Sequence, residues 1–280
     1  PNRRLIREKK TVQLLLPSLK MFGSVTRVLG RGLARKHGVV SINGRSLASI
    51  ASQINSAVAE NEYKEAVRYT HKNIKWTRKD VQFQTDALAN GLLEAACNPG
   101  DSIAVWLPEC SEKHVTQLAA AKAGLVFADF DLSIDTPEAL GDALADSGAK
   151  VLIFNSELDA VNCGRVLFDA IPELSGYYNN TGAPFHSSSF PNLKLMIHTG
   201  YDSLAGFHNF KHLPVPHPAT GGKLGVILPH LKDDTPLYVK YTKDSGGKAT
   251  KGEVMTHGTA LSSKEWSVVK SILDKQYIEF

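Results

Sequence analysis

The residues PGDSIAVWLPECSEKHVTQLAAAKAG, positions 99–124, contain one complete strand and one complete helix. Ser102–Leu107 is a short apolar run after a Pro-Gly-Asp turn, which is typical of a buried strand. Ser111–Lys122 repeats its apolar residues at helical spacing, and Gly124 follows as a helix stop. The stretch therefore predicts a buried strand joined to a helix, the unit from which α/β proteins are built.

The same alternation continues downstream. Leu125–Ala128 and Lys150–Phe154 are short apolar runs, and Pro137–Ser147 between them has a helical pattern that ends at Gly148. Strands and helices that alternate every ten to fifteen residues indicate a parallel sheet flanked by helices. This is the fold class that we predict.

Two further helices are expected upstream. Leu47, Ile50, Ile54 and Val58 recur at helical spacing and predict a helix over Ser46–Arg68. Thr77 is followed three residues later by Asp80, which resembles a capping box at the start of a second helix. The apolar stripe of this second helix consists of Val81, Leu88, Leu92 and Ala95. Residues 171–191 and 203–236 are rich in Gly, Pro, Ser and Asn and are expected to form long loops.

The composition is that of a folded domain. The chain has 280 residues, of which 42% are hydrophobic and 21% charged. The sequence contains no run of eighteen apolar residues, so it does not predict a membrane-spanning helix. The three cysteines lie far apart and the ten histidines are scattered, without zinc-ligand spacing. His212 and His217 flank a proline-rich LPVP segment, and we predict that both face solvent. We predict no metal site and a reducing compartment.

Charge divides the chain into two parts. Residues 1–45 carry eleven Lys or Arg and one acid, a net +10, which leaves 21 basic and 27 acidic residues, or −6, for residues 46–280. We predict a basic N-terminal extension over 1–45 and an α/β domain over 46–280. The extension has the composition of organellar presequences. Its candidate contacts with anionic lipid are Arg3, Arg4, Arg7, Lys9, Lys10, Arg27, Arg31, Arg35 and Lys36. Acidic partner subunits, RNA phosphates or a solvated tail are the alternatives, and nucleic-acid binding by the acidic body is not expected.

The candidate binding loop is YTKDSGGKATKGEVMTH, residues 241–257. Small residues, hydroxyls and lysines in such a loop can form a cradle for phosphate. The segment resembles the phosphate-binding loop of the adenylate-forming superfamily, and this resemblance implies the candidate residues Tyr241, Thr242, Gly247, Lys248, Lys251, Gly252, Thr256 and His257. Asp244 and Glu253 place carboxylates where triphosphate oxygens would lie. A Walker A motif is excluded because Glu253 and Val254 stand where Lys and Ser or Thr are required.

The loop resembles the phosphate-binding loop of the adenylate-forming superfamily, which includes acyl-CoA synthetases, luciferases and adenylation domains of peptide synthetases. The family form is roughly YTSGTTGKPKGVMLTH, so one residue is inserted near Ala249–Thr250. Segments upstream follow the family's order over about residues 60–260. They are Trp76-Thr77, Ala87–Leu92, Pro99–Pro108, Leu118–Gly124, Ser147–Leu152 and Leu193–Gly200. The resemblance implies the family's opening α/β subdomain.

The resemblance also implies what to expect of catalysis. In the family, the adenine-binding strand, the magnesium-positioning acid, the ribose-binding aspartate and the lid with its catalytic lysine all follow the part that this chain matches. We therefore expect a truncated domain over 46–280 that is not an enzyme, with no catalytic residue and no cofactor.

The leading hypothesis is a non-catalytic accessory subunit of a mitochondrial assembly, on the matrix side and peripheral to the inner membrane. Respiratory-chain complexes or ATP synthase are favoured as hosts, and a mitochondrial ribosome subunit is an alternative. Another alternative is a residual acyl-CoA or nucleotide-binding module without turnover, with Lys248, Lys251 and His257 as contacts. A third is an active ligase completed by a separate chain, which would require ATP–pyrophosphate exchange on reconstitution.

Overall fold

A computed structural model describes residues 49–95, 97–156, 162–177, 185–217, 222–274 and 277–280. The predicted extension, residues 1–45, lies outside this part, as does Leu47. The strands are β1 (Glu65–Tyr69), β2 (Ile74–Thr77), β3 (Ser102–Trp106), β4 (Val126–Phe130), β5 (Val151–Phe154), β6 (Leu195–His198), β7 (His208–Asn209), β8 (Pro236–Lys243), β9 (Ala249–Lys251), β10 (Met255–Thr256) and β11 (Ile278–Glu279).

The helices alternate with these strands. They are α1 (Ile50–Glu60), α2 (Arg78–Glu94), α3 (Ser111–Ala123), α4 (Pro137–Ser147), α5 (Cys163–Ala170), α6 (Gly222–Ile227), α7 (His257–Ala260) and α8 (Ser267–Leu273). Within the described ranges, no helix is both long enough and apolar enough to cross a membrane.

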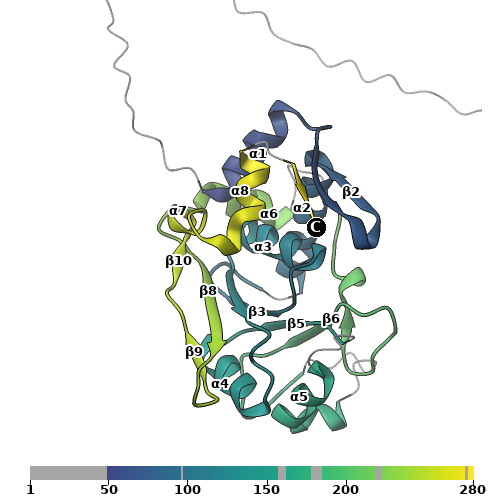
Figure 1. Ribbon diagram of the computed structural model, residues 1–280, viewed down its shortest axis with the longest axis vertical. Helices are drawn as coiled ribbons and strands as arrows, with labels where there is room; N and C mark the ends of the chain where they lie inside the picture. Colours follow the sequence, from purple (N-terminus) through teal and green to yellow (C-terminus); the bar gives the residue numbers. More distant parts are fainter. Residues whose placement is uncertain (1–48, 96, 157–161, 178–184, 218–221, 275–276) are drawn as a thin grey trace, which may run out of the picture. The chain divides into compact units, whose positions relative to one another are not determined.

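The main sheet confirms the predicted fold class. Its order is β10-β8-β4-β3-β5-β6-β7, with β9 also paired to β8 (Figure 1). The strands from β8 to β7 are parallel to their neighbours, whereas β9 and β10 run antiparallel to β8. A parallel sheet needs a crossover between neighbouring strands, and α3, α4 and α5 supply these crossovers.

The two faces of the sheet are buried under different helices. On β3, Ile103 and Val105 point to the face covered by α1, α2, α3, α6 and α8, and Ala104 and Trp106 point to the face covered by α4 and α5 (Figure 1). All four side chains are fully buried. Burial on both faces explains why β3 reads as a continuous apolar run rather than an alternating one.

A small second sheet corrects the prediction for Ser46–Arg68. The helix does include Ile50, Ile54 and Val58 as its buried face, but α1 ends at Glu60. Glu65–Tyr69 is instead β1, which pairs antiparallel with β2 and parallel with β11. Ala66, Val67 and Tyr69 are buried in the strand, so pairing and packing there outweigh the helical propensity.

The predicted helix boundaries are otherwise confirmed. Thr77 and Asp80 form a reciprocal capping box at the start of α2. Gly124 and Gly148 end α3 and α4 in the left-handed conformation. Residues 171–191 and 203–236 contain mainly loops and short turns of helix in their described parts, as expected.

Gly91 lets a long loop close against α2. A Cβ atom at position 91 would lie 1.8 Å from the carbonyl oxygen of Leu213. The neighbouring Val215 donates its N–H to the carbonyl of Ala87 at 2.8 Å. The loop that follows β7 is therefore held directly against the backbone of α2.

Candidate functional site

The segment 241–257 forms a β-hairpin and a short helix. Its first residues complete β8, which pairs with β9 through Tyr241 opposite Lys251 and Thr242 opposite Thr250. The turn between the strands contains Gly247 at a φ of 83°, a conformation that glycine adopts without strain. Thr242, Lys248 and Lys251 are exposed on this hairpin.

Asp244 closes the turn on itself. Its carboxylate Oδ1 accepts the backbone N–H of Lys248 at 2.9 Å. Its own N–H donates to the carbonyl of Lys248 at 2.9 Å, and Gly247 donates to the carbonyl of Asp244 at 3.1 Å. A phosphate cradle needs backbone N–H groups that point at the anion. Here two of these N–H groups are bonded to Asp244.

Tyr241 and Lys251 are tied to α4 through one carboxylate. The buried Tyr241 donates its hydroxyl to Asp146 Oδ2 at 2.7 Å, and Lys251 Nζ lies 3.0 Å from the same oxygen. Burial, followed by Asp146, raises the pKa of Tyr241 well above its ordinary value. These contacts fix the hairpin to the helix that covers one face of the sheet.

The last residues of the segment fold away from the turn. Gly252 donates its N–H to the carbonyl of Lys240 at 2.7 Å. Thr256 forms a capping box with Thr259. His257 is 1% exposed, and its ring nitrogens have no hydrogen-bond partner among the described residues. Burial lowers the pKa of His257 to about 4. Lys248 and Lys251 are exposed and His257 is buried, so the contacts named for the alternative ligand-binding module do not share one surface.

A different part of the fold contains a cavity of about 700 Å³. It lies at the carboxyl ends of β3, β5 and β6, from which Pro108, Asn155 and Thr199 line it. The β3 crossover α3 and the β5 crossover α5 cover opposite faces of the sheet, which makes this the topological switch point. In open α/β sheets ligands bind in the crevice at this position. The remaining lining residues are His71, Lys72, Asn73, Ile74, Glu109, Cys110, Glu112, Tyr201 and Lys211.

Charges in this cavity are largely paired within the protein. Lys72 Nζ lies 2.6 Å from Glu112 Oε2. Lys211 Nζ lies 4.6 Å from the centre of the Tyr201 ring. Burial raises the pKa of the Cys110 thiol to about 12, so this thiol is protonated and a weak nucleophile at neutral pH. These groups could contact a ligand, but none of them is an activated nucleophile.

A buried polar chain runs inward from the cavity. Glu109 contacts His114 Nε2 at 2.9 Å, and His114 Nδ1 contacts the Tyr69 hydroxyl at 2.7 Å. The His114 bond and nearby Lys113 lower the pKa of Glu109 to about 2. The imidazole of His114 also stacks near Tyr69 and Phe280, at centroid distances of 5.8 and 4.8 Å. The chain joins the small sheet to the loop after β3.

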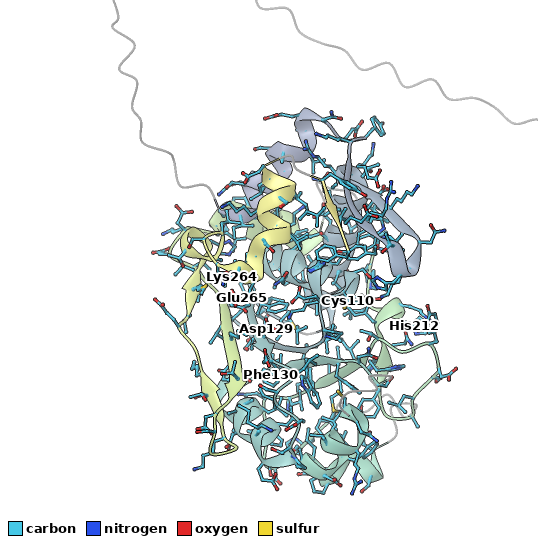
Figure 2. All side chains as sticks on the ribbon, viewed as in Figure 1. Cys110, Asp129, Phe130, His212, Lys264 and Glu265 are labelled. Atoms are coloured by element: carbon cyan, nitrogen blue, oxygen red, sulfur yellow. The ribbon has the colours of Figure 1, made fainter. Side chains whose placement is uncertain are left out.

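The same network continues under the sheet. Lys113 Nζ lies 2.9 Å from Glu109 and 3.0 Å from Asp129, and the Tyr238 hydroxyl donates to Asp129 at 2.9 Å. Asp129 on β4 therefore points to the α3 side, while the next residue, Phe130, packs on the other face (Figure 2). Burial raises the pKa of Asp129. These contacts fix β4 and β8 at the edge where the hairpin begins.

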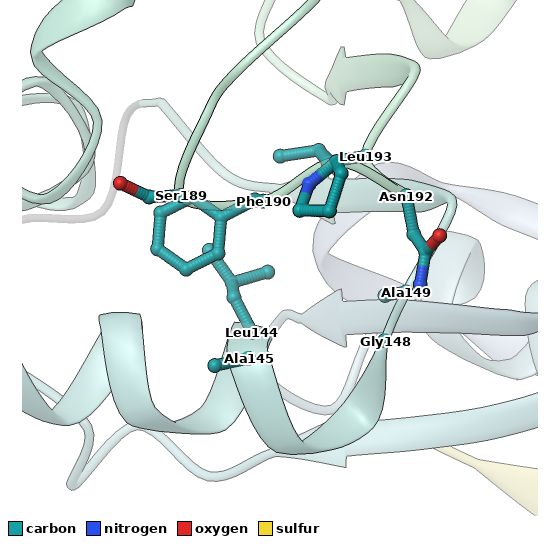
Figure 3. Close-up of a pocket in the computed structure, with 9 residues that line it drawn as sticks. Leu144, Ala145, Gly148, Ala149, Ser189, Phe190, Asn192 and Leu193 are labelled. Carbon is teal, nitrogen blue, oxygen red and sulfur yellow. The ribbon is translucent and has the colours of Figure 1, made fainter.

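Another cavity, of about 150 Å³, lies at the opposite end of the sheet (Figure 3). The Phe190 ring lies over Leu144 and Ala145 at the end of α4, and Asn192 lies beside Gly148 (Figure 3). Its lining includes none of the titratable groups described above. It reads as a packing defect under a loop.

The sequence interpretation missed the 700 Å³ cavity. Its lining residues come from five separate segments between His71 and Lys211, and no local motif links them. One signal was present, because Glu109 and Cys110 directly follow a strand that was predicted as buried, where ligand sites of parallel sheets occur.

The family model for the AMP-binding enzyme matches residues 54–277. The chain belongs to this family. It is 23% identical over 236 residues to the mitochondrial medium-chain acyl-CoA ligase ACSF2 of Macaca fascicularis, which covers 81% of this chain and 35% of that protein. It is 28% identical over 201 residues to an acetyl-coenzyme A synthetase of Halorhodospira halophila, covering 67% of this chain and 28% of that protein.

Solved structures agree on the fold. The luciferase-like enzyme of the mealworm Zophobas morio superposes with a TM-score of 0.61 at 11% identity, over 85% of this chain and 55% of that one. The resemblance to adenylate-forming enzymes is thus confirmed for family and fold. The chain spans about a third of the length of the curated relatives that it matches.

Proposed function

We propose that this chain is a non-catalytic, acyl-CoA-synthetase-like subunit of a larger mitochondrial assembly. The observation that carries the proposal is the bond from the Lys248 N–H to the Asp244 carboxylate, at 2.9 Å. A triphosphate oxygen at that N–H would have to displace this carboxylate. Like charges about 4 Å apart repel by about 1 kcal/mol in water, and by more in a partly desolvated site. The loop therefore disfavours the substrate that every adenylation reaction requires.

Two observations support the proposed mitochondrial location. The macaque relative is a mitochondrial protein by name, and residues 1–45 have the composition of an organellar presequence. We place the chain on the matrix side, peripheral to the inner membrane, with the basic residues of 1–45 near anionic lipid or acidic subunits. A respiratory-chain complex or ATP synthase is the favoured host, because the net −6 of residues 46–280 is unsuited to broad contact with ribosomal RNA.

The test is the native size of the endogenous protein in gently solubilised mitochondrial membranes, with the co-purifying proteins identified. We expect stable co-migration with a complex far larger than 30.4 kDa that persists in moderate salt. A free monomer in the soluble fraction would contradict the subunit proposal.

A second candidate is a module that binds acyl-CoA or a nucleotide without turnover. It is favoured by the 700 Å³ cavity at the switch point. A saturable thermal shift with acyl-CoA or ATP is expected for the wild type. Asn155→Leu should abolish the shift by narrowing the cavity, while Asn192→Leu, which lines the 150 Å³ cavity, should retain it. No shift with either ligand would remove this candidate.

A further inference from the structure

A third cavity, of about 260 Å³, brings together three of the ten histidines. His198 ends β6, His208 begins β7, and His212 ends the 3-10 turn Phe210–His212 (Figure 2 marks His212). Lys211 lines the same cavity. The other lining residues are Tyr201, Ser203, Phe207 and Asn209. None of the described lining residues is acidic, although residues 46–280 carry a net charge of −6.

The walls of this cavity are held in place by the fold. Phe207 is 7% exposed and packs edge-on against Phe154 at a centroid distance of 5.2 Å. Asn209 donates its side-chain amide to the carbonyl of Gly200 at 2.8 Å and accepts the N–H of Lys211 at 3.0 Å. These contacts fix both ends of the loop that carries Tyr201. The backbone that carries His208 and Lys211 is therefore fixed before any ligand arrives.

The electrostatics indicate repulsion between His208 and His212. Burial, and then the charge of His212, lower the pKa of His208 below its ordinary value of 6.5. The other groups that face it are His198 from β6, Tyr201 from the loop, and Lys211. Basic side chains in one cavity, with no acid among the described lining residues, favour an anion because the anion relieves their repulsion.

Metal coordination is the competing interpretation of several imidazoles. Among the described residues, no group of three or more His, Cys, Asp or Glu is arranged to hold a metal ion. Lys211 also brings a charge that a metal ion would oppose. An anion fits both the geometry and the charge of the cavity.

We propose that the cavity lined by His208, Lys211 and His212 binds the phosphoryl group of a small soluble phosphomonoester. The Lys211 ammonium and the imidazole N–H groups can each donate a hydrogen bond to a different phosphoryl oxygen. The site shares Tyr201 and Lys211 with the 700 Å³ cavity, but that cavity contains Glu109 and Glu112 and is not needed for this proposal. The site is also separate from the hairpin of residues 241–257.

The test is calorimetric titration of the full chain with glycerol 3-phosphate at pH 6. Saturable binding is expected. Lys211→Gln and His212→Asn should each weaken it at least fivefold, while the exposed His230→Asn and Lys232→Gln, which lie outside the cavity, should leave it unchanged. Urea unfolding of each variant separates loss of binding from loss of the fold. No saturable binding, or equal binding by all four variants, would overturn the proposal.

Two further binding measurements, with sulfate and with lipid vesicles, extend the test. Sulfate remains a dianion between pH 5.5 and 8, so its affinity reports protonation of the protein alone. It should fall as the pH rises and His208 loses its proton, and a constant affinity would contradict a contribution of the His208 charge to binding. Vesicles that contain phosphatidic acid present the same phosphoryl group on a surface. Binding to these vesicles without binding to glycerol 3-phosphate would contradict a soluble ligand.

Discussion

The Asp244 carboxylate accepts the backbone N–H of Lys248 at 2.9 Å, across the turn where the family's phosphate-binding loop lies. A carboxylate that bonds this N–H uses the same geometry as a phosphate oxygen, so the protein supplies its own anion. The neighbouring residues Tyr241 and Lys251 are tied to Asp146. The hairpin is therefore stabilised by contacts within the protein.

Removing this carboxylate should partly reopen the loop. Asp244→Gly is expected to tighten ATP binding about tenfold, which corresponds to about 1.4 kcal/mol and is the size of one screened like-charge repulsion. The measurement is equilibrium titration with fluorescent ATP. Glu94→Gln removes a charge from an exposed position on α2, outside the hairpin, and is the control. An unchanged affinity in Asp244→Gly would show that the carboxylate does not exclude the nucleotide.

Gly91 and Gly141 offer a paired test of the packing. Gly91→Ala places a methyl group on the backbone of Leu213, with the nearest atom 1.8 Å away, and should cost at least about 3 kcal/mol or prevent folding. Gly141→Ala meets its nearest atom, on Phe190, at 3.8 Å and should stabilise α4 by up to about 1 kcal/mol. Urea unfolding of both variants checks this. A Gly91→Ala variant as stable as the wild type would contradict the described path of the loop over α2.

The strands and helices of the main sheet could be predicted from the sequence more fully than the candidate site. Ser102–Leu107 and Pro137–Ser147 were predictable because their patterns are local and end at strong stop signals such as Gly148. Glu65–Tyr69 was not, because this strand is stabilised by pairing with β11, more than two hundred residues away. The histidine cavity likewise depends on the parallel pairing of β6 and β7, which places Ile197 beside His208.

The buried imidazole of His257 should make the protein sensitive to acid. Its pKa is about 4 in the folded state against 6.5 when exposed, so the unfolded chain binds more protons between these values. Its contribution is present above pH 6.5 and is lost as the pH falls toward 4, by at most about 3 kcal/mol.

His257→Leu isolates this contribution. The ring nitrogens have no hydrogen-bond partner among the described residues, so leucine should be tolerated at pH 7. Urea unfolding at pH 7, 6 and 5 should show a smaller loss of stability in His257→Leu than in the wild type, with His230→Asn as the exposed control. Parallel losses in the two proteins would refute the assignment.

Lys122 joins three helices through a buried charge. Its Nζ lies 2.6 Å from Asp86 of α2 and 2.9 Å from Asn55 of α1, and the side chain is fully buried. Lys122→Met should cost about 3 kcal/mol because Asp86 loses its partner, and Lys122→Met/Asp86→Leu should recover most of this loss. The double-mutant cycle is measured by urea unfolding. An equal effect of Asp86→Leu in the wild type and in Lys122→Met would mean that the pair is not coupled.

The most direct test of a non-catalytic chain is ATP–pyrophosphate exchange with the purified protein, magnesium and a panel of short-, medium- and long-chain fatty acids. An acyl-CoA ligase serves as the positive control. We predict an exchange rate no higher than that of the protein-free blank for every fatty acid. Saturable exchange that is lost in Lys248→Ala would contradict it, and would make the hairpin of residues 241–257 a working phosphate-binding loop.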